Sequence, residues 1–231
     1  MTIRDLVRPI PGVRAFSIFR QQIAFSGSPS FWEENYARGD TSGPGSYGSL
    51  ATTKAAFVNT FVQKHAVRSV IEFGCGDGHQ LSLARYPRYV GLDVSPTAIQ
   101  LCNQRFAGDN SKSFFIYNGE CFYDRSRFFV CDTAISLDVI YHLVEDEVFE
   151  RYMKHLFNSA ERFVVVYSSD AVVKGTAPHV RHREFRGWVQ MNCPNWGLIQ
   201  MTPGPVAGPD GADFFVYERA SQDSPTSLHH R

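Results

Sequence analysis

The stretch VIEFGCGDGHQ, residues 70–80, decides the fold, because an apolar run ends there in three glycines separated by a cysteine and an aspartate. The apolar half is typical of a strand that is buried on both faces. The glycines indicate that a ligand or another backbone comes close to the end of this strand. Ligands of parallel sheets bind beyond the carboxyl ends of the strands, so the same stretch predicts both the first strand and the binding site.

Outward from this stretch, apolar runs alternate with amphipathic segments. Helices are predicted at residues 13–25, 52–65, 79–86, 96–106, 144–157 and 183–191, the first of them ended by the turn-rich SGSPS. Further strands are predicted at residues 88–93, 112–117, 131–138, 162–169, 197–202 and 214–220, and the last two form a hairpin. This alternation predicts an α/β fold, a doubly wound and mostly parallel sheet with one antiparallel edge strand.

The composition is that of an ordinary globular protein. Lys plus Arg and Asp plus Glu both number 23 in 231 residues, so the formal net charge is +0 and no dedicated nucleic-acid-binding surface is indicated. The five cysteines are odd in number and lack CxxC spacing, which argues against a disulfide framework and a zinc site. Residues 1–22 break every apolar run with Arg, Pro or Gln, so we expect no signal peptide, no membrane span and a cytoplasmic location.

Two ligand classes compete for the glycine loop. A dinucleotide site needs GxGxxG, whereas the three glycines here follow GxGxG and Asp77 puts a negative charge where a pyrophosphate would lie. An adenosine without a pyrophosphate suits the loop better, because an acidic residue at the end of the next strand can bind both ribose hydroxyls. Asp93 stands at that position, and Glu120 follows the third strand. The alternatives are a tight turn without a ligand, a helix-capping carboxylate at Asp93 and a solvated acid at Glu120.

Four motifs, VIEFGCGDG, YVGLDVS, NGEC and AISLDVIYHL, resemble in order and spacing those of the class I S-adenosylmethionine (SAM) dependent methyltransferases, over roughly residues 30–220. The resemblance implies a seven-stranded sheet of order 3-2-1-4-5-7-6 with an antiparallel seventh strand, which agrees with the predicted hairpin. It implies an N-terminal helical lid segment at residues 1–62 and a SAM-binding domain at 63–220, and the polar composition of residues 221–231 predicts a disordered tail.

The resemblance also implies cofactor roles for particular residues. Glu72 would lie near the methionine amino group of SAM, Asp93 would bind the ribose hydroxyls, and Val94 would lie against the adenine. The full set of cofactor-binding residues that it implies is Trp32, Tyr36, Glu72, Gly74, Cys75, Gly76, Asp93, Val94, Glu120, Cys121 and Asp138. Glu120 and Cys121 stand where the family often has an Asp and a small residue. The product of SAM after methyl transfer is S-adenosylhomocysteine (SAH).

Methyl transfer from SAM requires few catalytic groups from the protein. Displacement at a sulfonium needs an aligned acceptor and, for a hydroxyl or a protonated amine, a base. His142 in DVIYHL is the first candidate for the base, because an imidazole titrates near neutral pH. Tyr141 and His182 are the other predicted catalytic residues. A packing role beneath the cofactor is the alternative for His142.

Two further segments are expected to reach the acceptor. HVRHREFRGW, residues 179–188, is basic and aromatic, so His179, Arg181 and Arg183 are predicted to bind the substrate; a solvated basic helix start is the alternative. FWEENYARGDTSGPGSYG, residues 31–48, resembles the lid of related small-molecule enzymes and adds Tyr47 to the substrate-binding set. A static packed loop is the alternative for this segment.

Three classes of function remain open. The first is a methyltransferase that acts on O or N of a small polar or anionic metabolite, including sugar-like acceptors. The second is an enzyme that methylates protein or RNA: LDVIYH in place of an Asn-Pro-Pro-Tyr signature disfavours RNA, and the basic HVRHR keeps it open. The third is a non-catalytic SAM-binding module. A metal, a membrane and a nucleic-acid partner are not expected, and a homodimer is an alternative to a monomer.

Overall fold

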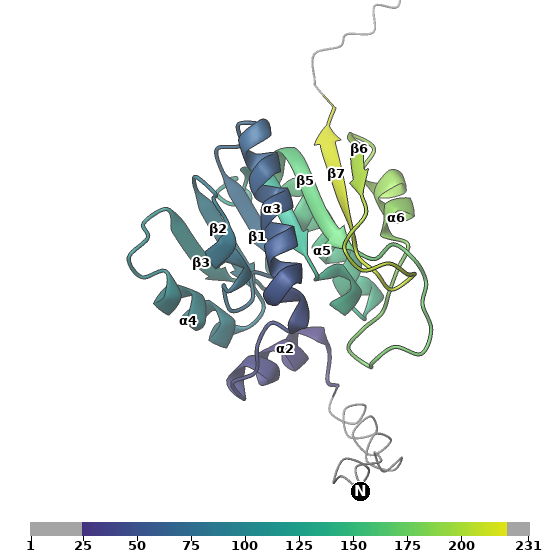
Figure 1. Cartoon of the computed structure of the whole chain (residues 1–231), viewed down its shortest axis with the longest axis horizontal. Coiled ribbons are helices and arrows are strands. Elements are labelled where there is room, and N and C mark those ends of the chain that lie inside the picture. Colours follow the sequence, from purple (N-terminus) through teal and green to yellow (C-terminus); the bar gives the residue numbers. More distant parts are fainter. Residues whose placement is uncertain (1–24, 221–231) are drawn as a thin grey trace, which may run out of the picture.

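The computed structural model describes residues 25–220, which form one sheet of seven strands in the order β3-β2-β1-β4-β5-β7-β6 (Figure 1). The strands are β1 (Val70–Phe73), β2 (Tyr89–Asp93), β3 (Lys112–Ile116), β4 (Cys131–Leu137), β5 (Ala160–Ser168), β6 (Trp196–Thr202) and β7 (Asp213–Arg219). The first five run parallel, whereas β7 is antiparallel to both β5 and β6. The predicted fold class and strand order are confirmed.

Four helices cover the two faces of the sheet. α3 (Gly48–Lys64) and α4 (Pro96–Arg105) pack on one face, and α5 (Asp146–Asn158) and α6 (Phe185–Asn192) pack on the other. Successive residues of a strand point to opposite faces, so Val164 of β5 packs with α5 and α6 while Val165 packs with α3. Burying an apolar side chain of this kind contributes about 1.5–3 kcal/mol. Both faces must therefore be apolar, as the uninterrupted strand sequences predict.

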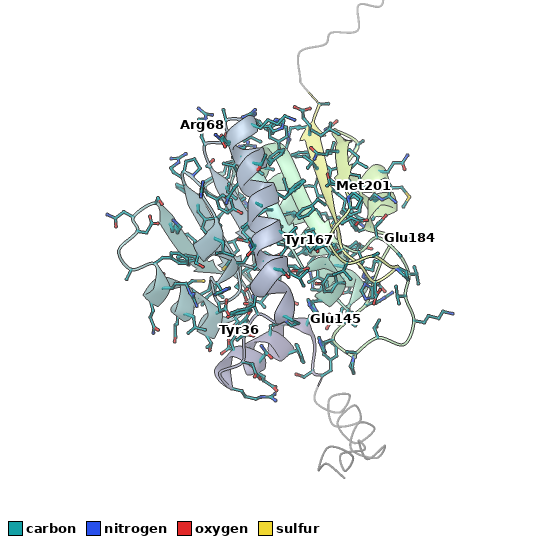
Figure 2. All side chains as sticks on the ribbon, in the orientation of Figure 1. Tyr36, Arg68, Glu145, Tyr167, Glu184 and Met201 are labelled. Atoms are coloured by element: carbon teal, nitrogen blue, oxygen red, sulfur yellow. The ribbon has the colours of Figure 1, made fainter. Side chains whose placement is uncertain are left out.

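A further helix, α2 (Ser28–Ala37), lies below the N-terminal start of α3 in Figure 1 and is hydrogen-bonded to both layers of helices. Its Glu33 accepts hydrogen bonds from Ser95 Oγ at 2.5 Å and Thr97 Oγ1 at 2.7 Å at the start of α4. Its Ser28 Oγ donates to Glu145 at the start of α5, at 2.7 Å. Figure 2 labels Tyr36 and Glu145 at this end of the molecule and Arg68 at the opposite end.

The connecting segments differ from the sequence prediction in two places. Residues 79–86 were expected to form a helix but contain only the 3₁₀ turn η2 (Gln80–Leu83). The helix cannot continue because the side chain of Asn59 on α3 binds the Leu83 carbonyl and the Arg85 N–H, at 3.0 and 2.7 Å. SGSPS, expected to end a helix, instead begins α2, where Pro29 suits the first turn.

Three expectations concern the two termini and the boundary between the predicted segments. The helix expected at residues 13–25 lies almost entirely outside the described residues, and the tail expected at 221–231 lies wholly outside them. The boundary expected after residue 62 falls within α3, which ends at Lys64.

Candidate active site

A cavity of about 380 Å³ lies at the carboxyl ends of β1, β2 and β4, and α2 forms part of its wall. The strand order reverses between β1 and β4, so the cavity lies where a ligand of a parallel sheet is expected. The predicted residues that line it are Trp32, Tyr36, Glu72, Gly74, Cys75, Gly76, Asp93, Val94, Glu120, Asp138 and His142. Every predicted cofactor-binding residue except Cys121 is therefore brought to one cavity.

The glycine loop uses all of its backbone N–H groups within the protein. Those of Gly74 and Cys75 donate to one carbonyl at 2.7 and 3.0 Å, and that of Gly76 donates to Asp93 Oδ2 at 2.9 Å. The acceptors for residues 74–79, in chain order, are Leu92 O, Leu92 O, Asp93 Oδ2, Ser42 Oγ, Cys75 O and Asp77 Oδ1. A phosphate cradle needs several free N–H groups, and the described loop has none to offer.

Glycine is required at the centre of this loop. Gly76 has φ +58°, a left-handed conformation that favours glycine. A Cβ at this position would lie 2.9 Å from the Tyr36 hydroxyl and would also overlap Ser42 Oγ. The loop therefore packs directly beneath the N-terminal segment, and any side chain at Gly76 would separate the two.

Asp77 faces this N-terminal segment and does not line the cavity. Its carboxylate accepts hydrogen bonds from the Tyr47 hydroxyl at 2.6 Å and the Ser42 N–H at 3.3 Å. Asp77 was expected to put a negative charge where a pyrophosphate would lie, but its side chain points to the N-terminal segment instead. The argument against a pyrophosphate rests on the lack of free N–H groups in the loop. Tyr47, predicted to bind the substrate, also lies outside the cavity wall and stacks on His79, with ring centroids 4.0 Å apart.

Asp93 ends β2 on the cavity wall with 6% of its surface exposed. Its two oxygens accept the Gly76 and Ser95 N–H groups, each at 2.9 Å. Burial raises the pKa of this carboxyl to about 6, against the opposing effect of these hydrogen bonds. A carboxylate has about four acceptor positions, so two remain for a pair of neighbouring hydroxyls such as those of a ribose.

Glu72 on β1 is the second buried carboxylate of the cavity. It accepts a hydrogen bond from the Tyr89 hydroxyl at 2.5 Å. Burial raises its pKa to about 7, while that hydrogen bond and the charge of Lys54 favour the ionised form. A cationic ligand group beside Glu72 would shift it fully to the carboxylate.

Asp138 follows β4 in a left-handed conformation, with φ +61°. Such a residue other than glycine costs about 1–3 kcal/mol and is found most often at functional sites. Its carboxylate pairs with Lys54 Nζ from α3 and accepts a hydrogen bond from the Tyr141 hydroxyl at 2.8 Å. Tyr141 does not line the cavity, so it acts on the site through Asp138.

His142 lines the cavity as a neutral imidazole. Its Nδ1 lies 3.0 Å from the His179 carbonyl, which can only accept, so Nδ1 carries the proton and Nε2 keeps its lone pair. Burial lowers the pKa of His142 to about 4. Trp32 of α2 packs edge-on against the ring, with centroids 4.9 Å apart. The side chain is held in one orientation and has one nitrogen able to accept a proton.

The arginines predicted to bind the substrate have partners within the protein. The Arg183 guanidinium donates to the carbonyls of Leu143 and Val144, pairs with Asp146 and is 11% exposed. Arg181 also pairs with Asp146, at 3.2 Å, and donates to Val144 O at 2.9 Å. Neither lines the cavity. Their structural role is to hold the connection after β5 against the start of α5.

The remaining predicted residues lie behind or beside the cavity. His179 stacks on Phe31 of α2, with centroids 4.3 Å apart, and His182 is hydrogen-bonded to Ser169 Oγ at 2.6 Å. Cys121 is exposed in the loop after β3. None of these three residues lines the cavity.

The polar side chains of the cavity wall that sequence reasoning missed include Lys54 and Gln80. A signal for Lys54 was present, because the buried residues of α3 recur at Ala51, Lys54, Ala55 and Val58, a helical period. A lysine on the apolar stripe of a helix indicates a buried partner, here Asp138.

Within residues 25–220, no cluster of three or more His, Cys, Asp or Glu side chains is arranged to hold a metal ion. No helix in the same range has the length and apolar character needed to cross a membrane.

Comparison with known proteins relates the fold of this chain to that of solved methyltransferases. No family model matches the sequence. The methyltransferase domain of bacterial CtHen1-C has a TM-score of 0.61 at 20% identity, over 75% of this chain and 100% of its own. Magnesium protoporphyrin IX methyltransferase from Synechocystis PCC 6803 with bound SAM has a TM-score of 0.61 at 16% identity, over 85% and 99%. The chain has the class I methyltransferase fold.

The class I methyltransferase fold also relates the chain to N-methyltransferase NodS from Bradyrhizobium japonicum WM9 in complex with SAH. That structure has a TM-score of 0.58 at 16% identity, over 74% of this chain and 86% of its own. Among curated proteins, a small RNA 2′-O-methyltransferase of Arabidopsis thaliana is 24% identical over 147 residues. The match covers 57% of this chain and 16% of that relative.

Proposed function

We propose that this protein is a SAM-dependent methyltransferase. The observation that carries the proposal is the pair of buried carboxylates, Glu72 and Asp93, in one cavity beside a glycine loop without free N–H groups. Asp93 suits the hydroxyls of a ribose and Glu72 suits an ammonium group, and SAM carries both without a phosphate. When bound, SAM would supply a methyl group on a sulfonium. The likeness to enzymes solved with SAM or SAH supports this assignment.

We further propose that the acceptor is a small polar metabolite methylated on O or N. His142 would take the proton from a hydroxyl or amine, since it is neutral at pH 7 and has one free ring nitrogen. Trp32 and Tyr36 of α2 would shield the reacting groups from water. The paired state of Arg181 and Arg183 favours an uncharged polar acceptor over an anionic one.

RNA is the second candidate acceptor. The curated relative supports this candidate, since it is named a small RNA 2′-O-methyltransferase. This weakens the expectation that nucleic acid is not a partner. The net charge of +0 and the pairing of the two arginines beside the cavity favour the metabolite.

Formation of SAH with a cell extract tests the proposal and separates these acceptors. The full chain is incubated with SAM and extract, and SAH is measured by mass spectrometry, with reactions lacking extract or protein as controls. We expect SAH to form equally after the extract has been treated with nuclease or with protease. Loss after nuclease treatment would identify RNA as the acceptor, and loss after protease treatment would identify protein. Absence of SAH in every extract would favour a non-catalytic module.

The affinity for SAH should fall below neutral pH. Glu72 must be ionised to accept hydrogen bonds from an ammonium group, and its pKa is about 7. Because the cation favours the carboxylate, binding at pH 6 must first remove a proton, and the dissociation constant from calorimetry should rise about tenfold between pH 8 and pH 6. Glu72→Gln should reduce this dependence to about twofold, the change that remains from Asp93 with its pKa of about 6. A constant affinity of the unmodified protein over this range would show that Glu72 does not contact the ammonium group.

A further inference from the structure

The charged residues of the cavity wall are four carboxylates and two cations. The carboxylates are Glu72, Asp93, Glu120 and Asp138, and the cations are Lys54 and Arg151. Arg151 extends from α5 towards Glu120, with 3.7 Å between the charged atoms, and 39% of its side chain is exposed. Lys54 extends from α3, is 1% exposed and acts on the charge of Glu72. The two cations therefore act on different carboxylates of the cavity: Arg151 lies near Glu120, and Lys54 acts on Glu72.

An α-amino acid group at the Glu72 end requires a partner for its carboxylate as well as for its ammonium. The glycine loop cannot supply this partner, because all the N–H groups of residues 74–79 donate within the protein. A buried carboxylate without a hydrogen-bonding partner is strongly disfavoured. Lys54 has three N–H donors and one carboxylate partner, Asp138, so it can bind a second carboxylate.

Gln80 adds an acceptor next to Lys54. Its Nε2 donates to the Ala51 carbonyl at 3.0 Å, one turn before Lys54 on α3. Its Oε1 is buried and has no hydrogen-bonding partner, although the residue lines the cavity. A buried amide oxygen without a donor is destabilising, and a ligand ammonium group there would supply the missing hydrogen bond.

We propose that Lys54 and Gln80 form a clamp for the α-amino acid group of SAM, and this inference rests on the proposed function. Lys54 binds the α-carboxylate, and Asp138 keeps its ammonium group within the cavity wall. Gln80 Oε1 accepts a hydrogen bond from the α-ammonium group, alongside Glu72. The clamp makes the protein selective for ligands that carry the amino acid as well as the adenosine.

Two ligands that differ only in this part test the clamp. SAH carries the α-amino acid group, whereas 5′-methylthioadenosine has the same adenosine and sulfur without it. In Lys54→Met, calorimetry should show SAH binding weakened about 30-fold and 5′-methylthioadenosine binding changed less than about twofold. Gln80→Leu should weaken SAH binding about fivefold, again without an effect on the shorter ligand. Lys64→Met, the same change at an exposed position of α3, is the matched control.

The same titrations separate the clamp from a structural role. Since Lys54→Met leaves Asp138 without its cation, the double variant Lys54→Met, Asp138→Asn removes the uncompensated charge and should show the same selective loss. Equal loss of both ligands in the double variant, or unchanged SAH binding in Lys54→Met, would overturn the inference while leaving the proposed function in place. Failure of the unmodified chain to bind SAH would overturn both.

Discussion

Replacing Asp93 with alanine is expected to weaken the binding of SAH about 100-fold, because two hydrogen bonds to a charged acceptor are lost. The carboxylate is 6% exposed at the carboxyl end of β2 and has acceptor positions left for two ribose hydroxyls. Asp93→Asn keeps one oxygen and the shape of the side chain, so its loss should be intermediate. Calorimetry with SAH measures both variants.

Asp132 provides the matched control. It is also a buried aspartate that accepts a backbone N–H, that of Arg68 at 2.6 Å, but it lies at the start of β4, away from the cavity. Asp132→Ala should lower the melting temperature without changing the SAH affinity of the folded protein. If Asp93→Ala and Asp93→Asn both bind SAH as tightly as the unmodified chain, the ribose assignment is wrong.

Replacing His142 with asparagine should slow methyl transfer by about 10²–10⁴-fold, the usual contribution of a general base. The asparagine amide can still donate towards the His179 carbonyl, where His142 Nδ1 donates at 3.0 Å, but the basic nitrogen is lost. SAH binding should change less than about threefold. The rate is measured in a single turnover with the extract fraction that supports SAH formation.

The pH dependence of the rate is an independent test of His142 as the base. Only the neutral imidazole can accept a proton, and its pKa is about 4, so the base should stay active at pH 5 and be lost as the pH falls through 4. His65→Asn, at the far end of α3, is the control and should leave the rate unchanged. A His142→Asn rate equal to that of the unmodified chain would assign the residue to packing.

Much of the cavity wall could be predicted because its signals are local. The apolar run before GCGDG predicts β1, and Asp93 is identified by its place at the end of β2, just before the Ser95 cap of α4. Carboxyl ends of parallel strands meet at one edge, so the order of the motifs is enough to bring these residues together.

The polar groups that depend on distant partners could not be placed in this way. Lys54 is buried because it meets Asp138, which lies 84 positions later in the chain. No partner for Arg183 stands near it in the sequence, but its guanidinium donates to the carbonyls of Leu143 and Val144, which lie 40 and 39 positions earlier in the chain. The residue type of Arg183 predicted that it binds an anion of the substrate. In the folded chain its guanidinium instead binds acceptors of the protein that are distant in the sequence.

The acceptor side was harder to predict for the same reason. Tyr47 was predicted to bind the substrate from its position in a glycine-rich segment, yet its hydroxyl donates to Asp77 at 2.6 Å. Their contact holds the segment after α2 on the glycine loop. Residues that hold the loops of a site together and residues that contact its ligand both occur in loops beside the strand ends. Their position in the sequence therefore does not distinguish the two roles.

Calorimetric titration of the full chain with SAH, and in parallel with NADH, tests the central claim most directly. One SAH molecule should bind per chain with a dissociation constant of about 1–100 μM, and NADH should give no binding heat because the loop of residues 74–79 has no free N–H for its pyrophosphate. Binding of NADH without SAH, or no binding of SAH at about 1 mM, would contradict the assignment of this cavity to SAM.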